Sequence, residues 1–149
     1  MKIVIQRCSS AKVEIEHKLI SEISTGMMIL VGISSFDTQE DIDYVVKKII
    51  NLRIFDDEQG VMNLAINDVQ GEILLISQFT LQANTKKGNR PSYINAARPE
   101  QAVPLYQNLI KVLQNHLTSQ IKTGEFGANM QVSLTNNGPV TIIIDSKNK

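Results

Sequence analysis

The sequence predicts one α/β domain of the α+β type, with a mixed, mostly antiparallel sheet and two main helices. The chain has 149 residues, which suits a single domain. Apolar residues alternate with a period of two near both ends, and only two segments show the helical period. Two helices are too few to cover both faces of a doubly wound parallel sheet.

The first third of the chain is expected to form strands. Apolar residues alternate over residues 2–6 and 12–16, and Leu19–Ile23 follows a polar turn, a spacing that favours a meander. Met27–Ile33 is a continuous apolar run, as expected of a strand buried on both faces. This run is too short to cross a bilayer, and no secretory signal opens the chain. We therefore expect a cytoplasmic protein with no membrane partner.

The segment Gln39–Asn51 is expected to form the first helix. Thr38 stands three residues before Asp41, which is a capping-box-like start. Residues at helical spacing form one apolar face, namely Ile42, Val45, Val46, Ile49 and Ile50.

The second helix is expected over Pro99–Leu117. Pro99 suits the first helical position. Pro104, five residues later, should kink the first turns or delay the helix start. The predicted inner face consists of Ala102, Leu105, Tyr106, Leu109, Val112, Leu113 and Leu117.

Three more strands are expected in the rest of the chain. Glu72–Leu81 lies between the helices and ends in polar residues. Met130–Leu134 and Val140–Asp145 form the tail, and Asn136-Asn137-Gly138 between them is a hairpin signal.

Composition limits the chemistry that the chain can perform. The net charge is zero, so a nucleic-acid partner has to be argued from a local patch. The single cysteine, Cys8, excludes an internal disulfide framework and suits a small buried hydrophobe. His17 and His116 are expected to be exposed, and the acidic run Asp56-Asp57-Glu58 to lie in a solvated loop. No metal motif, P-loop, dinucleotide fingerprint or serine-hydrolase elbow occurs, so we expect no metal and no cofactor.

Two polar segments are candidates for a site. Ser77-Gln78-Phe79-Thr80 ends a strand that should be buried, and polar groups in that position need partners or a ligand. The alternative is a strand that simply leaves the core. In Asn137-Gly138-Pro139, the proline cannot donate a backbone hydrogen bond, which leaves the Gly138 and Pro139 carbonyls potentially free to bind another group. An ordinary hairpin is the alternative here.

A basic loop lies between these segments. Residues 73–99 contain no Asp or Glu, whereas Lys86, Lys87, Arg90 and Arg98 carry positive charge. Together with the ring of Tyr93, such a loop can hold phosphate and stack a terminal base.

These segments together resemble the D-aminoacyl-tRNA deacylases, also called D-tyrosyl-tRNA deacylases. The two signature motifs are Ser77–Thr80 and Asn137–Thr141, and the similarity runs from Gln6-Arg7 almost to the end of the chain. Between them it includes Lys87–Tyr93. Further matching segments are Met62-Asn63-Leu64, Phe126-Gly127 and Met130–Leu134.

The resemblance implies an enzyme that hydrolyses D-aminoacyl-tRNA at its 3′ end and rejects the L form. It implies a barrel-like core and a homodimer whose active sites lie at the subunit interface. Ser77, Gln78, Phe79 and Thr80 would form the catalytic pocket floor. Gly138 and Pro139, joined by a cis bond, would reach into the partner's pocket and bind the substrate amino group. Arg7, Val140 and Thr141 would support this substrate-binding segment, and Lys86, Lys87, Arg90 and Tyr93 would contact tRNA.

The chemistry of such a site needs no strong nucleophile, because the aminoacyl ester is already activated. Backbone N–H groups around Gln78 and Phe79 would stabilise the oxyanion. The attacking oxygen would belong to water, to the substrate's ribose 2′-hydroxyl, or to Thr80 as a covalent nucleophile. Mischarged glycyl-tRNA is a second expected substrate, since glycine has no side chain to reject.

Some positions depart from the family pattern, and apart from Asn137, which opens the second motif, they lie beside the motifs. Gln82 and Asn89 replace a frequent aromatic and a frequent basic residue, and Tyr93 stands where Phe is frequent. Asn129 and Asn137 stand where Asp is common. Two other functions remain open at this point: a tRNA- or RNA-binding protein without catalysis, and a metal-free hydrolase of some other small ester.

Overall fold

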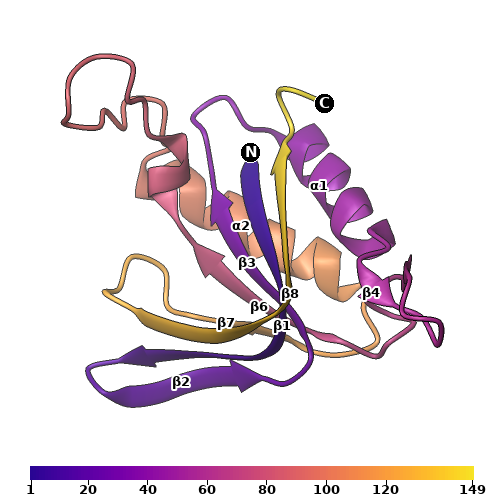
Figure 1. Cartoon of the computed structure of the whole chain (residues 1–149). Helices are drawn as coiled ribbons and strands as arrows, with labels where there is room; N and C mark the ends of the chain where they lie inside the picture. Colours follow the sequence, from indigo (N-terminus) through magenta and orange to yellow (C-terminus); the bar gives the residue numbers. More distant parts are fainter.

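The computed structural model describes residues Met1–Lys149 and contains eight strands, two α-helices and one 3-10 helix, η1. Figure 1 shows both α-helices on one side of the sheet, with α2 behind it. The helices are α1 (Gln39–Asn51), η1 (Phe79–Gln82) and α2 (Pro99–Gln114). The strands are β1 (Lys2–Ile15), β2 (Lys18–Ile23), β3 (Gly26–Gly32), β4 (Phe55–Asp56), β5 (Met62–Leu64), β6 (Glu72–Ser77), β7 (Ile121–Thr123) and β8 (Gln131–Asp145).

Strand β1 is the centre of the six-stranded sheet. Its first half, residues 2–8, pairs antiparallel with β3, and its second half, residues 11–15, pairs antiparallel with β2. Strand β8 runs antiparallel along nearly all of β1, while β6 and β7 add parallel pairings beyond β3. The long strands β1 and β8 curve together in Figure 1, which folds the sheet into a nearly closed, barrel-like form. The predicted fold class is therefore confirmed.

The expected meander at the start of the chain is wrong. The strand order is β2-β1-β3, so β2 and β3 lie on β1 rather than on each other. The reason is the length of β1: residues 2–6 and 12–16 were expected to form separate strands, but residues 2–15 form one strand of 14 residues. Because β1 is this long, β3 pairs with its first half and β2 pairs with its second half.

The expected hairpin at Asn136–Gly138 is also wrong. Strand β8 passes straight through these residues, and Gln6 pairs with Thr141 while Cys8 pairs with Asn136. The residues between them form a bulge opposite Arg7, and the Gly138–Pro139 peptide bond is cis. Pairing with β1 on both sides of the bulge replaces the turn that the local sequence favours.

Side chains alternate between two cores on opposite faces of the sheet. On β3, Met27, Ile29 and Val31 belong to the larger cluster beneath α1 and α2. Met28 belongs to a smaller cluster enclosed by the curved sheet, together with Cys8. Strand β3 is therefore buried on both faces, as predicted, and burial raises the pKa of the Cys8 thiol.

Helix α1 has the predicted bounds, and its capping box forms, with the Thr38 N–H donating to Asp41 Oδ2 at 2.8 Å. Helix α2 begins at Pro99 as predicted but ends at Gln114, three residues before Leu117. Pro104 lies inside the helix and does not delay its start, although a proline there cannot donate the usual hydrogen bond to the Glu100 carbonyl.

Polar groups fasten the two ends of the chain to α1. The Met1 ammonium, fully buried, donates to Asp37 at 2.5 Å and to Ser146 Oγ at 2.6 Å. Asp41 accepts from Ser146 and from Lys147. Burial would raise the pKa of Asp41, but these bonds and the Thr38 N–H outweigh it and hold the pKa well below its usual range.

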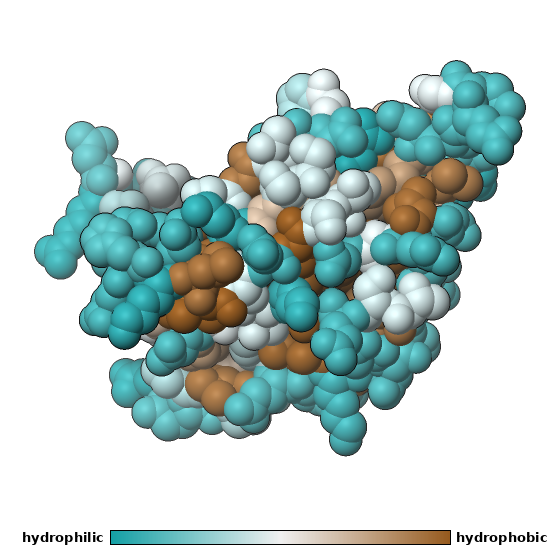
Figure 2. Space-filling model, turned by 90° about the horizontal axis from the view of Figure 1, so that it is seen from below, coloured by the Kyte–Doolittle hydropathy of each residue, from teal (hydrophilic) through white to brown (hydrophobic).

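None of the helices is both long and apolar enough to cross a membrane. The face formed around β2, seen from below in Figure 2, is mainly hydrophilic, with apolar atoms in several separate patches.

Candidate active site

A pocket of about 520 Å³ opens where β6 ends, between the start of α2 and residues 126–130. Ten of its fifteen lining residues are hydrophobic, and none has an ionisable side chain. The polar groups that the lining offers are therefore backbone groups, a hydroxyl and side-chain amides. The lining residues are Val31, Ile33, Ile76, Ser77, Gln78, Phe79, Ala97, Pro99, Ala102, Phe126, Gly127, Ala128, Asn129, Met130 and Val132.

The pocket floor is built where β6 gives way to η1. The predicted strand to Leu81 stops at Ser77, and the chain then turns into the 3-10 helix. Gly32 permits this turn, because a Cβ on residue 32 would lie 2.7 Å from the Leu81 Cβ and 2.9 Å from the Gln78 carbonyl oxygen. Gln82 fastens the other end of η1, since its buried amide donates to the Gly32 carbonyl at 2.7 Å.

The free N–H groups at this turn belong to Phe79 and Thr80. Gln78 was expected to contribute an oxyanion donor, but its N–H donates to the Val31 carbonyl at 2.7 Å. No backbone carbonyl of the chain accepts from the N–H of Phe79 or Thr80, because the first N–H groups of a helix have no partner in it. Phe79 lines the pocket, whereas Thr80 lies directly after the lining residues, so these are two free donors at the edge of the pocket floor.

The Thr80 hydroxyl is held by an amide rather than by a base. Gln78 Nε2 donates to Thr80 Oγ1 at 2.5 Å, so the hydroxyl accepts one bond and keeps its proton free to donate. The histidines lie elsewhere: His17 is exposed in the β1–β2 turn, and His116 is exposed beyond the end of α2. No group of three or more His, Cys, Asp or Glu side chains is placed to hold a metal ion.

The second motif lies on β8 and is held by Arg7. The guanidinium of Arg7, 6% exposed, donates through Nε to the Asn137 carbonyl at 2.9 Å and through Nη1 to the Ile54 carbonyl at 2.7 Å. Asp56 Oδ1 pairs with Nη1 at 2.9 Å. Asp56 was expected in a solvated loop, but it lies in β4 and holds this arginine. Gly138 has φ +127°, a conformation that side chains rarely adopt.

Within one chain, the two motifs lie far apart. Ser77 is level with Val31 and Ile3, whereas the bulge at Gly138 lies opposite Arg7, four residues further along β1. Four residues along a strand and three inter-strand spacings, from β8 through β1 and β3 to β6, together correspond to a separation of about 20 Å between Ser77 and Gly138. Gly138, Pro139, Val140 and Thr141 accordingly do not line the pocket.

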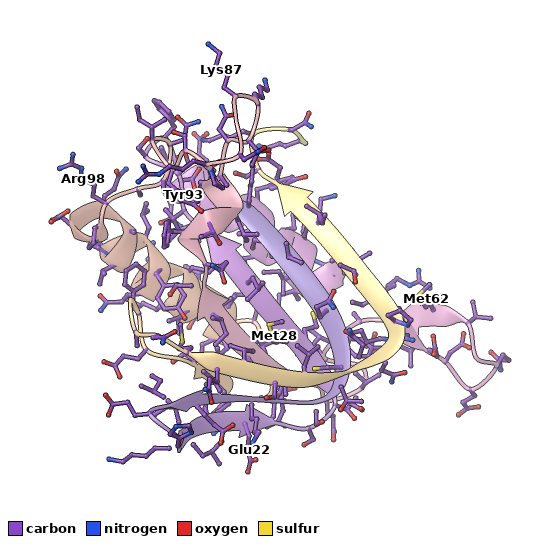
Figure 3. All side chains as sticks on the ribbon, turned by 60° about the vertical axis from the view of Figure 1, so that its left-hand side comes forward. Glu22, Met28, Met62, Lys87, Tyr93 and Arg98 are labelled. Carbon is purple, nitrogen blue, oxygen red and sulfur yellow. The ribbon has the colours of Figure 1, made fainter.

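The basic loop stands at the same end of the molecule as η1. Figure 3 shows Lys87 projecting from the loop tip, with Tyr93 near its base and Arg98 at the start of α2. The rings of Tyr93 and Phe79 meet edge to face, with centroids 5.1 Å apart. Lys86 and Arg90 are exposed, so all the predicted tRNA contacts are accessible.

The pocket wall formed by residues 126–130 and by Ala97–Ala102 was not among the predicted site residues. Phe126-Gly127 and Met130 belong to the resembling segments, but nothing in their local pattern places them opposite Ser77. This placement depends on the loop after β7 crossing to the start of α2.

Comparison with known proteins gives consistent results over the whole chain. The sequence model of the family described as D-Tyr-tRNA(Tyr) deacylase matches residues 4–145. Curated proteins named D-aminoacyl-tRNA deacylase are 60% identical in Flavobacterium psychrophilum and 62% identical in Bacteroides thetaiotaomicron, each over 149 residues, 100% of this chain and 99% of the relative.

Solved structures agree with these matches. One titled "c-Myc DNA Unwinding Element Binding Protein" superposes with a TM-score of 0.93 at 44% identity, covering 97% of this chain and 98% of the other. Another, titled as a probable eukaryotic D-amino acid tRNA deacylase, has a TM-score of 0.80 at 15% identity over 96% and 97% of the two chains, which shows a shared fold alone. The chain belongs to the D-Tyr-tRNA(Tyr) deacylase family.

Proposed function

We propose that this chain is a D-aminoacyl-tRNA deacylase that uses the Ser77–Thr80 pocket together with the Gly138-Pro139 segment of a second copy. Water adds across the ester, giving the free D-amino acid and tRNA with its terminal ribose hydroxyl restored. The observation that carries the activity is about 60% identity over the whole chain to enzymes with this name. These matches do not favour the alternatives, a non-catalytic RNA-binding protein or a general esterase.

The apolar pocket suits the terminal adenosine of the tRNA. Phe126 offers a ring, and Ala97 and Ala102 leave room beside it. A flat base fits such a lining, since stacking on an aromatic ring is worth about 1–3 kcal/mol. The ester attached to that adenosine then lies at Ser77–Thr80, on the pocket floor.

The N–H groups of Phe79 and Thr80 stabilise the oxyanion that forms when the ester carbonyl is attacked. One such donor typically contributes about 10²–10³ in rate. The attacking oxygen comes from water, assisted by the substrate's ribose 2′-hydroxyl, and the Thr80 hydroxyl orients it. A covalent Thr80 intermediate is disfavoured, because the group bonded to Oγ1 is an amide that cannot take a proton.

A homodimer brings the two motifs together. The sheet face away from the helices exposes Ile143 by 74%, and it carries the half-buried Val4 and Leu30. The Gln6 Oε1 atom on this face is buried without a hydrogen-bond partner. An apolar face with an unpaired buried acceptor suits contact with another chain, and a two-fold interface uses the same face on both copies.

In that dimer, the Gly138 and Pro139 carbonyls of one copy accept hydrogen bonds from the substrate ammonium in the other copy's pocket. Arg7 holds the segment through the Asn137 carbonyl, and Val140 and Thr141 continue it along β1. With the amino group fixed, an L side chain points into the pocket wall, whereas a D side chain points outward. Rejecting the L form by about 10⁴ requires roughly 5.5 kcal/mol, which collision with fixed backbone can supply. Glycyl-tRNA enters as well, because it has no side chain to reject.

The test is a deacylation time course with D-Tyr-tRNA, L-Tyr-tRNA and Gly-tRNA in the presence of a chelator. We expect rapid loss of the D-tyrosyl and glycyl esters and a persisting L-tyrosyl ester. Loss of both tyrosyl esters would contradict the selection mechanism, and loss of none would contradict the proposed activity. Light scattering of the same sample tests the dimer independently.

A further inference from the structure

We infer that the single-stranded 3′ end of the tRNA leaves the pocket over the Phe79–Tyr93 ring pair and places a backbone phosphate in a hollow between Lys2 and Lys86. This inference rests on the proposed function, and it adds a stacking site and a phosphate site outside the catalytic pocket. The ligand class is single-stranded nucleic acid directly upstream of the esterified nucleoside.

The ring pair connects the pocket to the basic loop. Phe79 lines the pocket, and its ring contacts Tyr93 edge to face at 5.1 Å. Both rings remain accessible, with Phe79 57% and Tyr93 38% exposed, and the adjacent Ile94 is 84% exposed. Exposed aromatic surface beside a nucleotide pocket suits stacking of the next bases, which tolerates any sequence.

The loop that carries Tyr93 is fixed at its base. Asn84 and Ser92 exchange backbone hydrogen bonds of 2.8 and 3.0 Å, and the Ala97 N–H donates to the Ile33 carbonyl at 2.9 Å. Tyr93 therefore has a defined position relative to the pocket, whereas the loop tip around Lys87 projects away (Figure 3).

A polar hollow of about 290 Å³ lies at the end of η1, whose first residue, Phe79, lines the pocket. It is lined by Lys2, Gln82, Ala83, Asn84, Thr85, Lys86 and Asn95, so two cations and several amides surround it and no carboxylate does. Neither lysine is paired with an acid. Asp145 lies opposite Lys2 in the ladder, but it does not line the hollow. Free ammonium and amide donors in one hollow match a phosphodiester group.

The order of these features gives the strand a path. The pocket takes the terminal nucleoside, the rings lie at its mouth, and the hollow follows beyond η1. Lysine contacts with phosphate supply affinity that depends on salt, whereas stacking does not. The two kinds of contact can therefore be separated by experiment.

The experiment compares D-Tyr-tRNA with D-tyrosyl-adenosine, which has the same ester but no upstream nucleotides. In the double variant Lys2→Gln/Lys86→Gln, we expect KM for D-Tyr-tRNA to rise about tenfold or more at low salt. The slope of log KM against log salt should fall by about 0.7 for each phosphate that the variant no longer neutralises. In Tyr93→Leu, KM should rise about five- to tenfold with the slope unchanged. Hydrolysis of D-tyrosyl-adenosine should be unaffected in the lysine variant. In Tyr93→Leu, which also loses the packing of Tyr93 on Phe79, the loss on D-Tyr-tRNA should exceed the loss on D-tyrosyl-adenosine.

The matched control is Lys18→Gln/Lys111→Gln, which removes two exposed lysines far from the loop. It should leave KM and the salt slope at their wild-type values. An unchanged slope in Lys2→Gln/Lys86→Gln, or an equal loss on D-tyrosyl-adenosine, would overturn the inferred path. If the wild-type protein cleaved neither ester, the proposed function itself would fail, which is a separate result.

Discussion

Replacing Arg7 by Met tests whether this side chain holds the Asn137–Pro139 segment in place. The substitution removes three hydrogen bonds, to the Asn137 carbonyl, the Ile54 carbonyl and Asp56. Bonds to a charged donor are worth about 1.5–3 kcal/mol each. The Asp56 pair adds less than about 1 kcal/mol, because its carboxylate is 45% exposed.

The expected loss is smaller than the sum of these bonds. Removing the guanidinium also relieves the cost of burying its charge. We therefore expect the free energy of unfolding to fall by about 3 kcal/mol, which for a domain of this size lowers Tm by about 6–12 °C. A displacement of the segment by about 1 Å is enough to reduce deacylation about 10²-fold. Arg7→Lys should be intermediate, since an ammonium cannot reproduce the planar fork.

The measurements are thermal unfolding by circular dichroism and the rate of D-Tyr-tRNA deacylation. Arg53→Met is the matched control, because Arg53 also donates to a carbonyl, that of Asn63 at 2.6 Å, but is exposed. Its Tm should change by no more than about 2 °C. If Arg7→Met kept both the wild-type Tm and the wild-type rate, the support assigned to Arg7 would be refuted.

Three further predictions concern the hydroxyl, the pH dependence of the rate and acid stability. Thr80→Val keeps the backbone N–H and removes the hydroxyl, so we expect the deacylation rate to fall by no more than about a hundredfold. The rate is measured by single-turnover kinetics. A loss above about 10⁴ would instead indicate that Thr80 is a covalent nucleophile. Because no ionisable side chain lines the pocket, the profile of kcat/KM between pH 5 and 9 should show only the titration of the substrate's amino group, at about 7.7. A second inflection in this profile that disappears when a protein side chain is replaced would contradict this prediction. Asp41 has a pKa well below its unfolded value of about 3.9, so its stabilising contribution is present above about pH 4 and is lost as the pH falls further. In acid titrations followed by fluorescence, Asp41→Asn should therefore be less stable than wild type at pH 7, with the difference shrinking below pH 4; an equal difference at both pH values would exclude this linkage.

Helix α1 illustrates what local sequence is able to predict. Its bounds follow from the spacing of Ile42, Val45 and Ile49 and from the Thr38–Asp41 cap, all of which lie within a few turns of chain. The burial of Met27–Val31 on both faces was predictable for the same reason, since a continuous apolar run has no side to present to water.

The Gly138 segment illustrates what local sequence does not predict. Asn137-Gly138 favours a two-residue hairpin, yet β8 continues, because β1 offers partners on both sides of the bulge and Arg7 binds the Asn137 carbonyl. The contact between Arg7 and Asn137 spans 130 residues of sequence. The expected meander failed similarly, since the order of strands depends on which edge of β1 each strand meets.

The sequence by itself determined the fold class, the helices and the residues of both motifs, because side-chain period, caps and motif residues are properties of neighbouring positions. Only the tertiary structure decided which N–H groups at Ser77–Thr80 are free, which residues wall the pocket, and that the two motifs lie about 20 Å apart in one chain. These properties depend on pairings between segments that are far apart in the chain. The free energy of such pairings cannot be inferred from the pattern of neighbouring residues.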